Sequence, residues 1–371
     1  MEFTIKRDTL LKSLNFVQGT IEKKNTLPIL SNVLLELKKN QLSIVATDLD
    51  IVFYDEITEV KTIKEGSTTT SATIIYDILR KISSNSEINF VLKSENKLSL
   101  KSENADFNLL CLPTDNFPTF SDNFEGEEVL LDSKSFLKLL NKTKISISND
   151  DTRHYLNGIF FHLTESQGKN YFTGVATDSH RLSSSSLEIG KINEFRSFIL
   201  PRKAVFQLCS LLSETSEKII LQAAENKVRF CLGKTKLISK VIDGKFPDYK
   251  KVVPTKNEKT LIVGSKDFVS SIERVASVSL DRKEGLKLTI NKDNVQLSVN
   301  SANSGDGNEK INAEFNSNNL NISFNSKYLL DIASEVENKN LKLNLKDSSS
   351  PVLVEDLSDK NSFYVIMPMK L

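Results

Sequence analysis

The chain has 371 residues, of which 49 are Lys or Arg and 48 are Asp or Glu, and 39% of its residues are hydrophobic. This length exceeds what one hydrophobic core usually serves, so it excludes a single small module and predicts two or three domains. The net charge of +1 lacks the basic surplus that proteins binding phosphate groups usually carry, and taken alone it argues against a nucleic-acid partner.

The apolar segments and the cysteines exclude further classes. No apolar run approaches the roughly 20 residues of a membrane-spanning helix, and residues 1–20 lack the basic start and apolar core of a signal peptide. Cys111, Cys209 and Cys231 are odd in number and lack CxxC spacing, which argues against a disulfide framework and against a zinc site. We therefore expect a soluble, cytoplasmic protein whose cysteines are buried thiols.

The first third of the chain predicts two helices and two groups of strands. A short strand over 3–5 precedes an amphipathic helix over 8–17, in which Leu10, Leu14 and Val17 recur at helical spacing. Alternating apolar and polar residues, separated by polar turns, predict strands in the segments that follow. These further elements are strands over 32–38, 41–47 and 51–57, a helix over 72–82 and a meander over 88–112.

The same order of elements recurs in the second and third thirds. The second third has a strand over 129–131, helices over 133–144 and 201–212 and a meander over 218–242, and the last third has strands over 261–263, 286–291, 295–301 and 309–315, helices over 265–278 and 326–336 and a meander over 341–367. Asp8, Ser133 and Ser265 are predicted N-caps, and Pro201 suits a first helical turn. Because strands follow strands without helical crossovers, we predict antiparallel sheets and the α+β class.

Repeated strings support a triplicated chain. Residues 45–48 and 175–178 both read Val-Ala-Thr-Asp, and the string Glu-Asn-Lys recurs at the same displacement of 130 positions. Phe-Pro-Thr-Phe at 117–120 is answered by Phe-Pro-Asp-Tyr at 246–249. Such a unit is far longer than the roughly 20–50 residues of a solenoid repeat. We predict three domains, over residues 1–125, 126–252 and 253–371.

One string, Asp178-Ser179-His180-Arg181, offers an acid, a nucleophile and a base in succession. Neighbouring residues of an extended segment point to opposite faces, so the string cannot by itself align Ser, His and Asp. We interpret it as a polar turn in which Arg181 packs or pairs locally, and an enzyme using these residues is the last-ranked hypothesis. The histidines are scattered, and neither a phosphate loop nor a dinucleotide fingerprint is present. We predict no catalytic residue, no metal site and no cofactor.

Charge is distributed unevenly along the chain. The three predicted domains carry net charges of −4, +6 and −1. In the predicted helix over 133–144, Lys134, Lys138 and Lys142 share one face because they lie four residues apart. For a single helix, a solvated polar face is the simpler interpretation. Repetition of basic helices predicts that they attract one shared polyanion.

Five longer motifs give the chain a specific resemblance. They are Thr-Leu-Pro-Ile-Leu-Ser-Asn at 26–32, Tyr-Leu-Asn-Gly at 155–158, Ala-Thr-Asp-Ser-His-Arg-Leu at 176–182, Phe-Pro-Asp-Tyr at 246–249 and Tyr-Val-Ile-Met-Pro-Met-Lys-Leu at 364–371. With these motifs the chain resembles the bacterial sliding clamps, the beta subunit of DNA polymerase III, over essentially its whole length and in three copies.

The resemblance implies a head-to-tail homodimer closed into a ring of six domains, with helices lining the hole and sheets forming the outer wall. Such a ring would encircle duplex DNA, act as a processivity factor that tethers the replicative polymerase, and catalyse no reaction. Its DNA contacts can be few and blind to sequence, because threading retains it. Only nine of the basic residues are Arg, and Lys suits loose phosphate attraction better than base reading. The alternative is a peptide-binding scaffold of the same fold that does not encircle DNA.

The resemblance also implies two sets of site residues. DNA contacts fall on Lys24, His154, Tyr155 and Arg202, and helix position adds Arg80, Lys138, Lys142 and Lys203. An apolar groove between the second and third domains would bind short linear motifs of polymerases, the clamp loader and repair proteins. The groove residues implied are Arg153, Leu156, Thr177, Ser179, His180, Arg181, Leu182, Pro247, Lys251, Val252, Tyr328, Val365, Met367, Pro368, Met369 and Lys370.

Two qualifications apply to these groove residues. Without the resemblance, Val365 and Met367 would be interpreted as ordinary strand core. Four positions depart from the family pattern: Ser179 stands where Gly is frequent, Lys251 and Lys370 where Arg is frequent, and Pro351 where some members have Ser. Lys cannot make the bidentate contacts of Arg, and Ser179 adds a side chain, so we expect a shifted preference among partner motifs.

Overall fold

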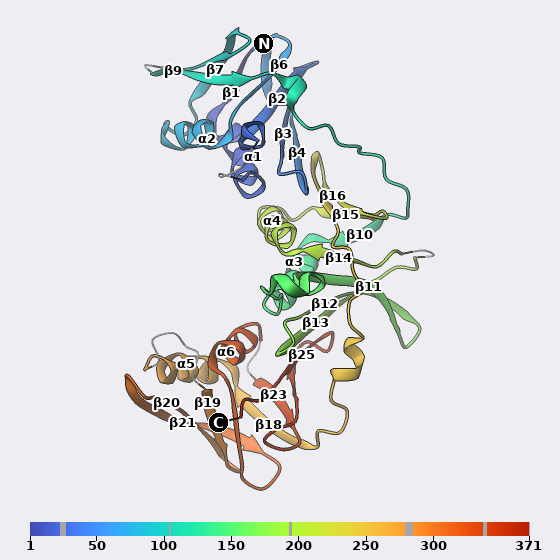
Figure 1. The fold of residues 1–371 in the computed structure, drawn as a ribbon, viewed down its shortest axis with the longest axis vertical. Coiled ribbons are helices and arrows are strands. Elements are labelled where there is room, and N and C mark those ends of the chain that lie inside the picture. Colours follow the sequence, from blue (N-terminus) through green and yellow to red (C-terminus); the bar gives the residue numbers. More distant parts are fainter. Residues whose placement is uncertain (23–26, 104, 193–194, 279–284, 337–339, 371) are drawn as a thin grey trace. The chain divides into compact units, whose positions relative to one another are not determined.

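The computed structural model describes the chain except for residues 23–26, 104, 193–194, 279–284, 337–339 and 371. Contacts divide the chain into two compact units, whose course is drawn in Figure 1. Unit 1 comprises Met1–Lys134, Ile192–Arg196 and Lys203–Val241, and unit 2 comprises Ser135–Lys191, Ser197–Arg202 and Ile242–Leu371. The middle third of the chain thus contributes residues to both units.

Unit 1 contains an antiparallel sheet with the order β10-β15-β16-β17-β4-β3-β2-β6-β9-β8-β7-β1-β5. Its strands are β1 (Glu2–Lys6), β2 (Asn32–Lys38), β3 (Gln41–Thr47), β4 (Ile51–Ile57), β5 (Val60–Lys64), β6 (Gly66–Ser71), β7 (Glu87–Ser94), β8 (Lys97–Ser102), β9 (Ala105–Leu112), β10 (Val129–Asp132), β15 (Lys218–Ala223), β16 (Lys227–Leu232) and β17 (Thr235–Lys240). Helices α1 (Arg7–Thr20) and α2 (Ala72–Lys81) lie side by side against these strands (Figure 1), and the 3-10 turns are η1 (Pro28–Ser31) and η2 (Thr114–Asn116).

Unit 2 contains a second antiparallel sheet with the order β14-β11-β12-β13-β25-β24-β23-β18-β21-β20-β19-β22. Its strands are β11 (Gly158–Ser166), β12 (Lys169–Thr177), β13 (Arg181–Ile189), β14 (Phe198–Pro201), β18 (Lys259–Gly264), β19 (Gly285–Ile290), β20 (Asn294–Ser301), β21 (Gly305–Phe315), β22 (Leu320–Asn325), β23 (Asn340–Leu345), β24 (Val352–Asp356) and β25 (Ser362–Ile366). Helices α5 (Ser265–Ala276) and α6 (Ser326–Ser334) pair in this unit, and the 3-10 turns are η3 (Asp151–Leu156) and η4 (Tyr249–Val252). Helices α3 (Ser133–Lys144) and α4 (Arg202–Ser213) have residues in both units.

The described elements confirm the α+β class and the threefold order of helices and meanders. They also add a strand before the second helix of each predicted repeat, because β6, β14 and β22 directly precede α2, α4 and α6, and the first repeat gains β5 as well. The predicted caps need correction: α1 begins at Arg7, α3 at Ser133 and α5 at Ser265, so Asp8, Ser133 and Ser265 all lie inside the first turn. Pro201 ends β14 and precedes α4. No helix among the described residues is long and apolar enough to cross a membrane.

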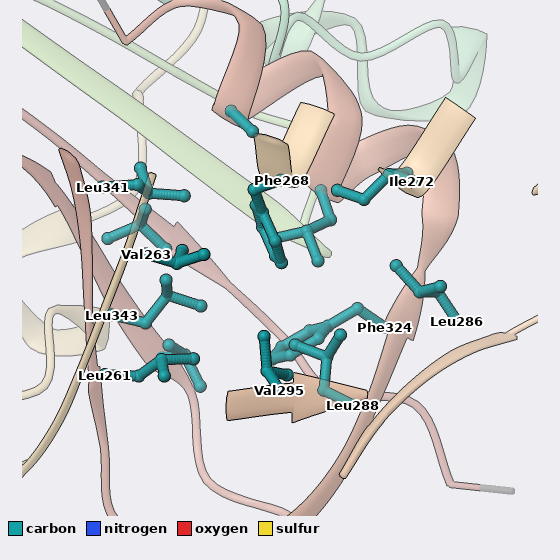
Figure 2. Packing of buried hydrophobic residues seen from close by; sticks show 14 of the residues in the cluster. Leu261, Val263, Phe268, Ile272, Leu286, Leu288, Val295, Phe324, Leu341 and Leu343 are labelled. Atoms are coloured by element: carbon teal, nitrogen blue, oxygen red, sulfur yellow. The ribbon is translucent and has the colours of Figure 1, made fainter. Parts of the chain in front are cut away.

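The core of the last third shows how the amphipathic patterns are satisfied. Phe268, Ile272 and Val275 lie three or four residues apart on α5, so one face of the helix is apolar and buried. Figure 2 shows Phe268 among side chains that point inward from the surrounding strands, including Val263 and Phe324. Full burial of each such side chain stabilises the fold by roughly 1.5–3 kcal/mol. This core holds in place the last third of the chain, which supplies one wall of the site described below.

The same local structure joins consecutive thirds of the chain within each unit. In unit 1, β17 pairs with β4, and in unit 2, β25 pairs with β13. The turn that leads into β13 is held by Thr177, whose Oγ1 donates to the carbonyl oxygen of Arg181 at 2.7 Å, and by Asp178, whose Oδ1 accepts from two backbone N–H groups. The turn brings residues 179–182 beside the end of β25.

Candidate functional site

An apolar hollow of about 290 Å³ opens in unit 2 where the turn before β13 meets the end of β25. Most of its surface is apolar although it faces solvent. Its lining residues are Thr177, Ser179, His180, Arg181, Leu182, Pro247, Asp248, Tyr249, Val252, Val365 and Met367. The structure therefore brings together nine of the predicted groove residues, and we refer to the hollow and its lining as the groove.

The floor of the groove is a buried apolar cluster. Leu156, Leu182 and Val365 are buried together with Val175, Ile199 and Phe246. At the mouth, by contrast, Val252 is 53% exposed and Met367 is 43% exposed. Large apolar side chains that remain exposed beside a packed floor mark a surface whose burial under another apolar group is favourable.

Arg181 fixes one wall of the groove from within. Its side chain is 7% exposed, its Nε donates to Asp178 Oδ2 at 3.1 Å, and its Nη1 donates to Asp331 Oδ2 at 2.7 Å. The guanidinium also lies 4.3 Å from the centroid of the Tyr328 ring, on which the His180 ring stacks. The local pairing predicted for Arg181 is confirmed. Because both carboxylates are engaged, Arg181 positions the turn and the Tyr328 ring that supports His180.

Arg153 and Ser179 form part of the rim of the groove. Arg153 Nη1 donates to Ser179 Oγ at 2.6 Å, and Arg153 Nε donates to Asp150 Oδ2 at 2.9 Å. Hydrogen bonds from Thr152 and Arg153 hold the pKa of Asp150 below its ordinary value. Ser179 has φ +75°, in the left-handed region that favours Gly. The side chain that departs from the family pattern is thus tied to an arginine of the rim.

The C-terminal segment forms the remaining wall. The N–H of Met367 donates to the carbonyl oxygen of His180 at 2.9 Å, and the N–H of Met369 donates to that of Ser323 at 2.7 Å. These bonds hold the segment between the turn before β13 and the β22 strand. Pro368 is half-buried between them, and Lys370 is exposed. Lys251 is also exposed and lies 3.3 Å from Asp248.

Two groove residues were missed by the site prediction, Asp248 and Tyr249, although they belong to the repeated Phe-Pro-x-aromatic string. Tyr249 O–H lies 3.0 Å from His162 Nε2, and the His162 ring stacks on Phe160. Burial, with a smaller effect of Lys250, lowers the pKa of His162 to about 4. Burial likewise raises the pKa of Tyr249, so both groups are neutral near pH 7.

The groove does not contain a catalytic triad. Asp178 accepts hydrogen bonds from the backbone of its own turn and from Arg181, and Ser179 Oγ accepts from Arg153. The His180 ring stacks on Tyr328. The three side chains are therefore turned to separate partners. Within the described residues, no group of three His, Cys, Asp or Glu side chains could hold a metal ion.

One predicted DNA contact is wrong. Lys142 is 1% exposed, and its Nζ lies 2.7 Å from Asp359 Oδ2 and 3.8 Å from Asp356 Oδ2. Burial is the largest single effect on Asp359 and opposes its ionisation, but the hydrogen bond and charge of Lys142, the N–H of Asn361 and the charge of Lys138 together outweigh it and keep the pKa of that carboxyl below its usual value. Lys138, on the same face of α3, is 39% exposed and lies 3.5 Å from Asp359. Part of the predicted basic face thus serves internal carboxylates.

The other predicted DNA contacts lie at or near the surface of their own units. In unit 2, His154 is exposed, with its Nε2 3.1 Å from the carbonyl oxygen of Asp243, and Tyr155 and Arg202 are half-buried. In unit 1, Arg80 is exposed beside Asp77, and Lys203 Nζ contacts Asp48 and the carbonyl oxygen of Thr20. Lys24 lies outside the described residues.

Comparison with known proteins assigns the chain to one family. Residues 1–121, 130–248 and 250–370 match the N-terminal, central and C-terminal domains of the DNA polymerase III beta subunit. The beta sliding clamps of Caulobacter vibrioides and Escherichia coli K12 are each 33% identical, with full coverage of both chains. A sliding clamp from Bartonella birtlesii, solved bound to griselimycin, superimposes with a TM-score of 0.95 at 37% identity, again over both whole chains. The chain therefore belongs to the DNA polymerase III beta subunit family, the bacterial sliding clamps, which are non-catalytic processivity factors of DNA replication.

Proposed function

We propose that this sliding clamp works as a head-to-tail homodimeric ring that encircles duplex DNA and tethers the replicative polymerase. The groove would receive short linear motifs of polymerases, the clamp loader and repair proteins, one at a time. The three domains would span residues 1–125, 126–252 and 253–371, and the protein would act in the cytoplasm, where its DNA and polymerase partners are found.

Open strand edges are the observation that supports ring closure best. In β9, residues 105–110 pair with β8 on one side and with no described strand on the other. In β21, residues 305–312 pair with β20 only, within the described part of the chain. Such edges invite another strand. We propose that β9 of one protomer pairs with β21 of its partner, so that both outer sheets continue across the contact.

A hollow and an exposed leucine beside β9 support the same contact. The hollow has a volume of about 580 Å³ and is lined in part by Ile74, Ile78 and Phe107. Leu110 is 83% exposed, and Ile74 is 52% exposed. Apolar side chains at an unpaired edge give a partner strand both backbone hydrogen bonds and apolar area to cover.

For DNA we propose contacts from Arg80, Lys138, His154, Tyr155, Arg202 and Lys203, together with Lys24. Lys142 is left out because its ammonium is buried against carboxylates. Lys138 and Lys203 have acidic neighbours as well, so their attraction to phosphate is partly offset. Weak attraction without base contacts suits a ring that slides.

For partner peptides we propose the groove as described, with Met367, Val252 and Leu182 taking apolar side chains. Met is adaptable and suits several ligands. We also propose that griselimycin, which is bound to the Bartonella birtlesii clamp, binds this chain in the groove. The other predicted groove residues Arg153, Tyr328, Lys251, Pro368, Met369 and Lys370 would select among motifs.

Threading is tested by the topology of the DNA. The clamp is loaded onto nicked circular DNA and onto linear DNA with free ends, and its residence is followed by gel filtration. We expect long residence on the circle and rapid loss from the linear molecule, because a ring slides off an open end. Equal residence on the two would contradict encirclement and favour the peptide-binding scaffold.

A further inference from the structure

Another hollow, of about 500 Å³, lies in unit 1, where the connector over residues 114–122 faces strands β2, β3, β4 and β17. Its lining includes the aromatic rings of Tyr54 and Phe120 and the charged groups of Glu36, Asp122 and Lys236. None of these residues belongs to the groove, to the proposed DNA contacts or to the edge of β9. We refer to this hollow as the connector hollow.

Glu36 is the lining carboxylate that a ligand can reach. Asp122 is fully engaged, because it accepts from Lys236 Nζ at 2.6 Å and from Arg229 Nη1 at 2.7 Å. Glu36 accepts from Lys38, but the side chains of the two are 38% and 70% exposed. An ion pair so open to water contributes little free energy, so another cation can replace Lys38.

The cation at the other end of the connector hollow does not prevent this exchange. Two strands, β3 and β4, separate β2, which carries Glu36, from β17, which carries Lys236. Three strand spacings put the two residues roughly 14 Å apart along the sheet. That distance exceeds the Debye length of about 8 Å at physiological ionic strength, so the repulsion between Lys236 and a cation at Glu36 is largely screened.

The rings of the connector hollow favour a flat cation. Phe120 is 37% exposed, and Tyr54 is half-buried with its O–H 3.2 Å from Ser43 Oγ. A guanidinium group can lie on the face of such a ring while its N–H groups donate in pairs to a carboxylate. A lysine ammonium has neither the flat shape nor the paired donors.

The chain builds this arrangement twice from its own arginines. Arg181 lies 4.3 Å from the centroid of the Tyr328 ring and donates to Asp331. In the same way, Arg229 lies 4.6 Å from the centroid of the Phe124 ring and donates to Asp122. The connector hollow offers rings and a carboxylate, but none of its lining residues is an arginine.

The corresponding place in unit 2 is closed by the chain itself. Strands β2 and β3 pair in the register of β11 and β12, so Glu36 takes the position of His162. Phe120 takes the position of Tyr249 in the repeated string. His162 Nε2 lies 3.0 Å from the Tyr249 hydroxyl, whereas a carboxylate and a phenyl ring cannot form such a bond. A nitrogen group on an aromatic ring is thus what the fold places there when it fills the space.

We propose that the connector hollow is a docking site for an arginine side chain of a partner protein, whose guanidinium lies on the Phe120 ring and donates to Glu36. In free arginine the α-amino and α-carboxyl groups would need partners as well. The other charged groups of the lining, Asp122 and Lys236, are already paired with each other. The side chain of an arginine within a polypeptide has no such demand.

The test is a titration of the full chain with N-acetylarginine N-methylamide, followed by saturation-transfer difference NMR. We expect saturable binding, and none for the matching citrulline compound, which has a similar shape but no charge. Glu36→Gln should weaken binding at least about tenfold, because the charged hydrogen bonds are lost. Lys38→Met should tighten binding about twofold to fivefold, because the competing ion pair is removed.

A matched control is Glu87→Gln. Glu87 forms a similarly exposed pair with Lys61 but does not line the connector hollow, so this variant should bind like the native chain. Native affinity in Glu36→Gln, equal binding of the citrulline compound or no saturable binding by the native chain would each overturn the proposal. If melting shows that Glu36→Gln is unfolded, Phe120→Ala decides, since its unchanged affinity would exclude the ring contact. Tighter binding of free arginine than of the capped compound would overturn the assignment to a partner protein.

Discussion

Lys142 belongs to the core of unit 2 although its spacing with Lys134 and Lys138 predicts a surface that faces phosphate. Residue type and helical spacing place a side chain on a face, but they do not say what covers that face. Here the covering group is the turn between β24 and β25, which carries Asp356 and Asp359 from more than two hundred positions further along the chain. That pairing could not be predicted from local sequence, because only the tertiary fold brings the carboxylates to α3.

Substitution of Lys142 by Met should destabilise the protein strongly. The change removes the buried cation that pairs with Asp356 and Asp359, and breaking a buried ion pair from one side typically costs about 3–5 kcal/mol of the free energy of unfolding. Lys138→Met is the matched control, because Lys138 is 39% exposed and its ion pair of 3.5 Å should contribute less than about 1 kcal/mol. Urea unfolding followed by circular dichroism measures both. Equal effects would contradict the assigned core role.

His162 should make stability depend on pH. Its pKa is about 4 in the folded chain, below the ~6.5 of an unfolded histidine. Between these values the unfolded chain binds more protons, so the free energy of unfolding falls as pH drops from about 6.5 to 4, by at most about 3 kcal/mol. The half-buried ring keeps some hydration, which makes the change smaller. Melting temperatures of the native chain and His162→Gln, compared across this range, should diverge with the native chain losing more; parallel curves would contradict it.

Groove residues were predictable to the extent that they lie in contiguous motifs. The string at 176–182 supplied five lining residues, from Thr177 to Leu182. Asp331, which orients Arg181 from α6, has no local signature and was missed. Tyr249 was visible in a repeated string, and the offset of 129 to Phe120 could have singled it out.

Among elements, β6 was missed because its sequence lacks an alternating pattern. β6 reads Gly-Ser-Thr-Thr-Thr-Ser, which resembles a polar connection. It is a strand because β2 supplies a full ladder of partners, from Asn32 with Ser71 to Leu37 with Gly66. Long, periodic segments such as α5 were predicted because their own residues determine the buried face.

The C-terminal segment is an element whose removal should separate binding from folding. Deletion of residues 367–371 removes Met367 from the groove and the backbone bonds to His180 and Ser323, while β25 keeps its pairing with β13. We expect loss of polymerase stimulation in a primer-extension assay, with an unchanged dimer in sedimentation. A chain shortened only by residues 370–371 is the control and should retain most stimulation. Full stimulation by the longer deletion would refute the groove assignment.

At the scale of the whole molecule, the net charge of +1 was a poor guide to the partner. The middle third carries +6 and the first carries −4, so the sum hides a basic middle third behind an acidic surplus elsewhere in the chain. The structure reduces the basic surplus further, since Lys138, Lys142 and Lys203 all have carboxylate neighbours. Steering by so modest a field is weak and screened by salt, which leaves topology as the main tether.

Ring closure should fail when the β9 edge is made acidic. Leu110→Asp places a charge on an 83% exposed side chain at the proposed contact, so it should shift the protein from dimer to monomer in sedimentation velocity. Griselimycin binding per chain should stay unchanged, because the groove lies in unit 2. Leu357→Asp is the control, since Leu357 is 48% exposed in the turn after β24 and belongs to neither β9 nor β21. A dimer that survives Leu110→Asp would rule out this edge.

β9 and β21 are different strands, so the proposed contact joins two different surfaces of the protomer instead of two copies of one surface. Contacts of this kind close into a ring only if the rotation from one copy to the next divides a full turn; otherwise copies add without limit and form a filament. For this clamp the required rotation is half a turn. A substitution far from β9 and β21 that alters the bend between the first and third domains would therefore leave both adhesive edges intact and turn a soluble ring into a fibre.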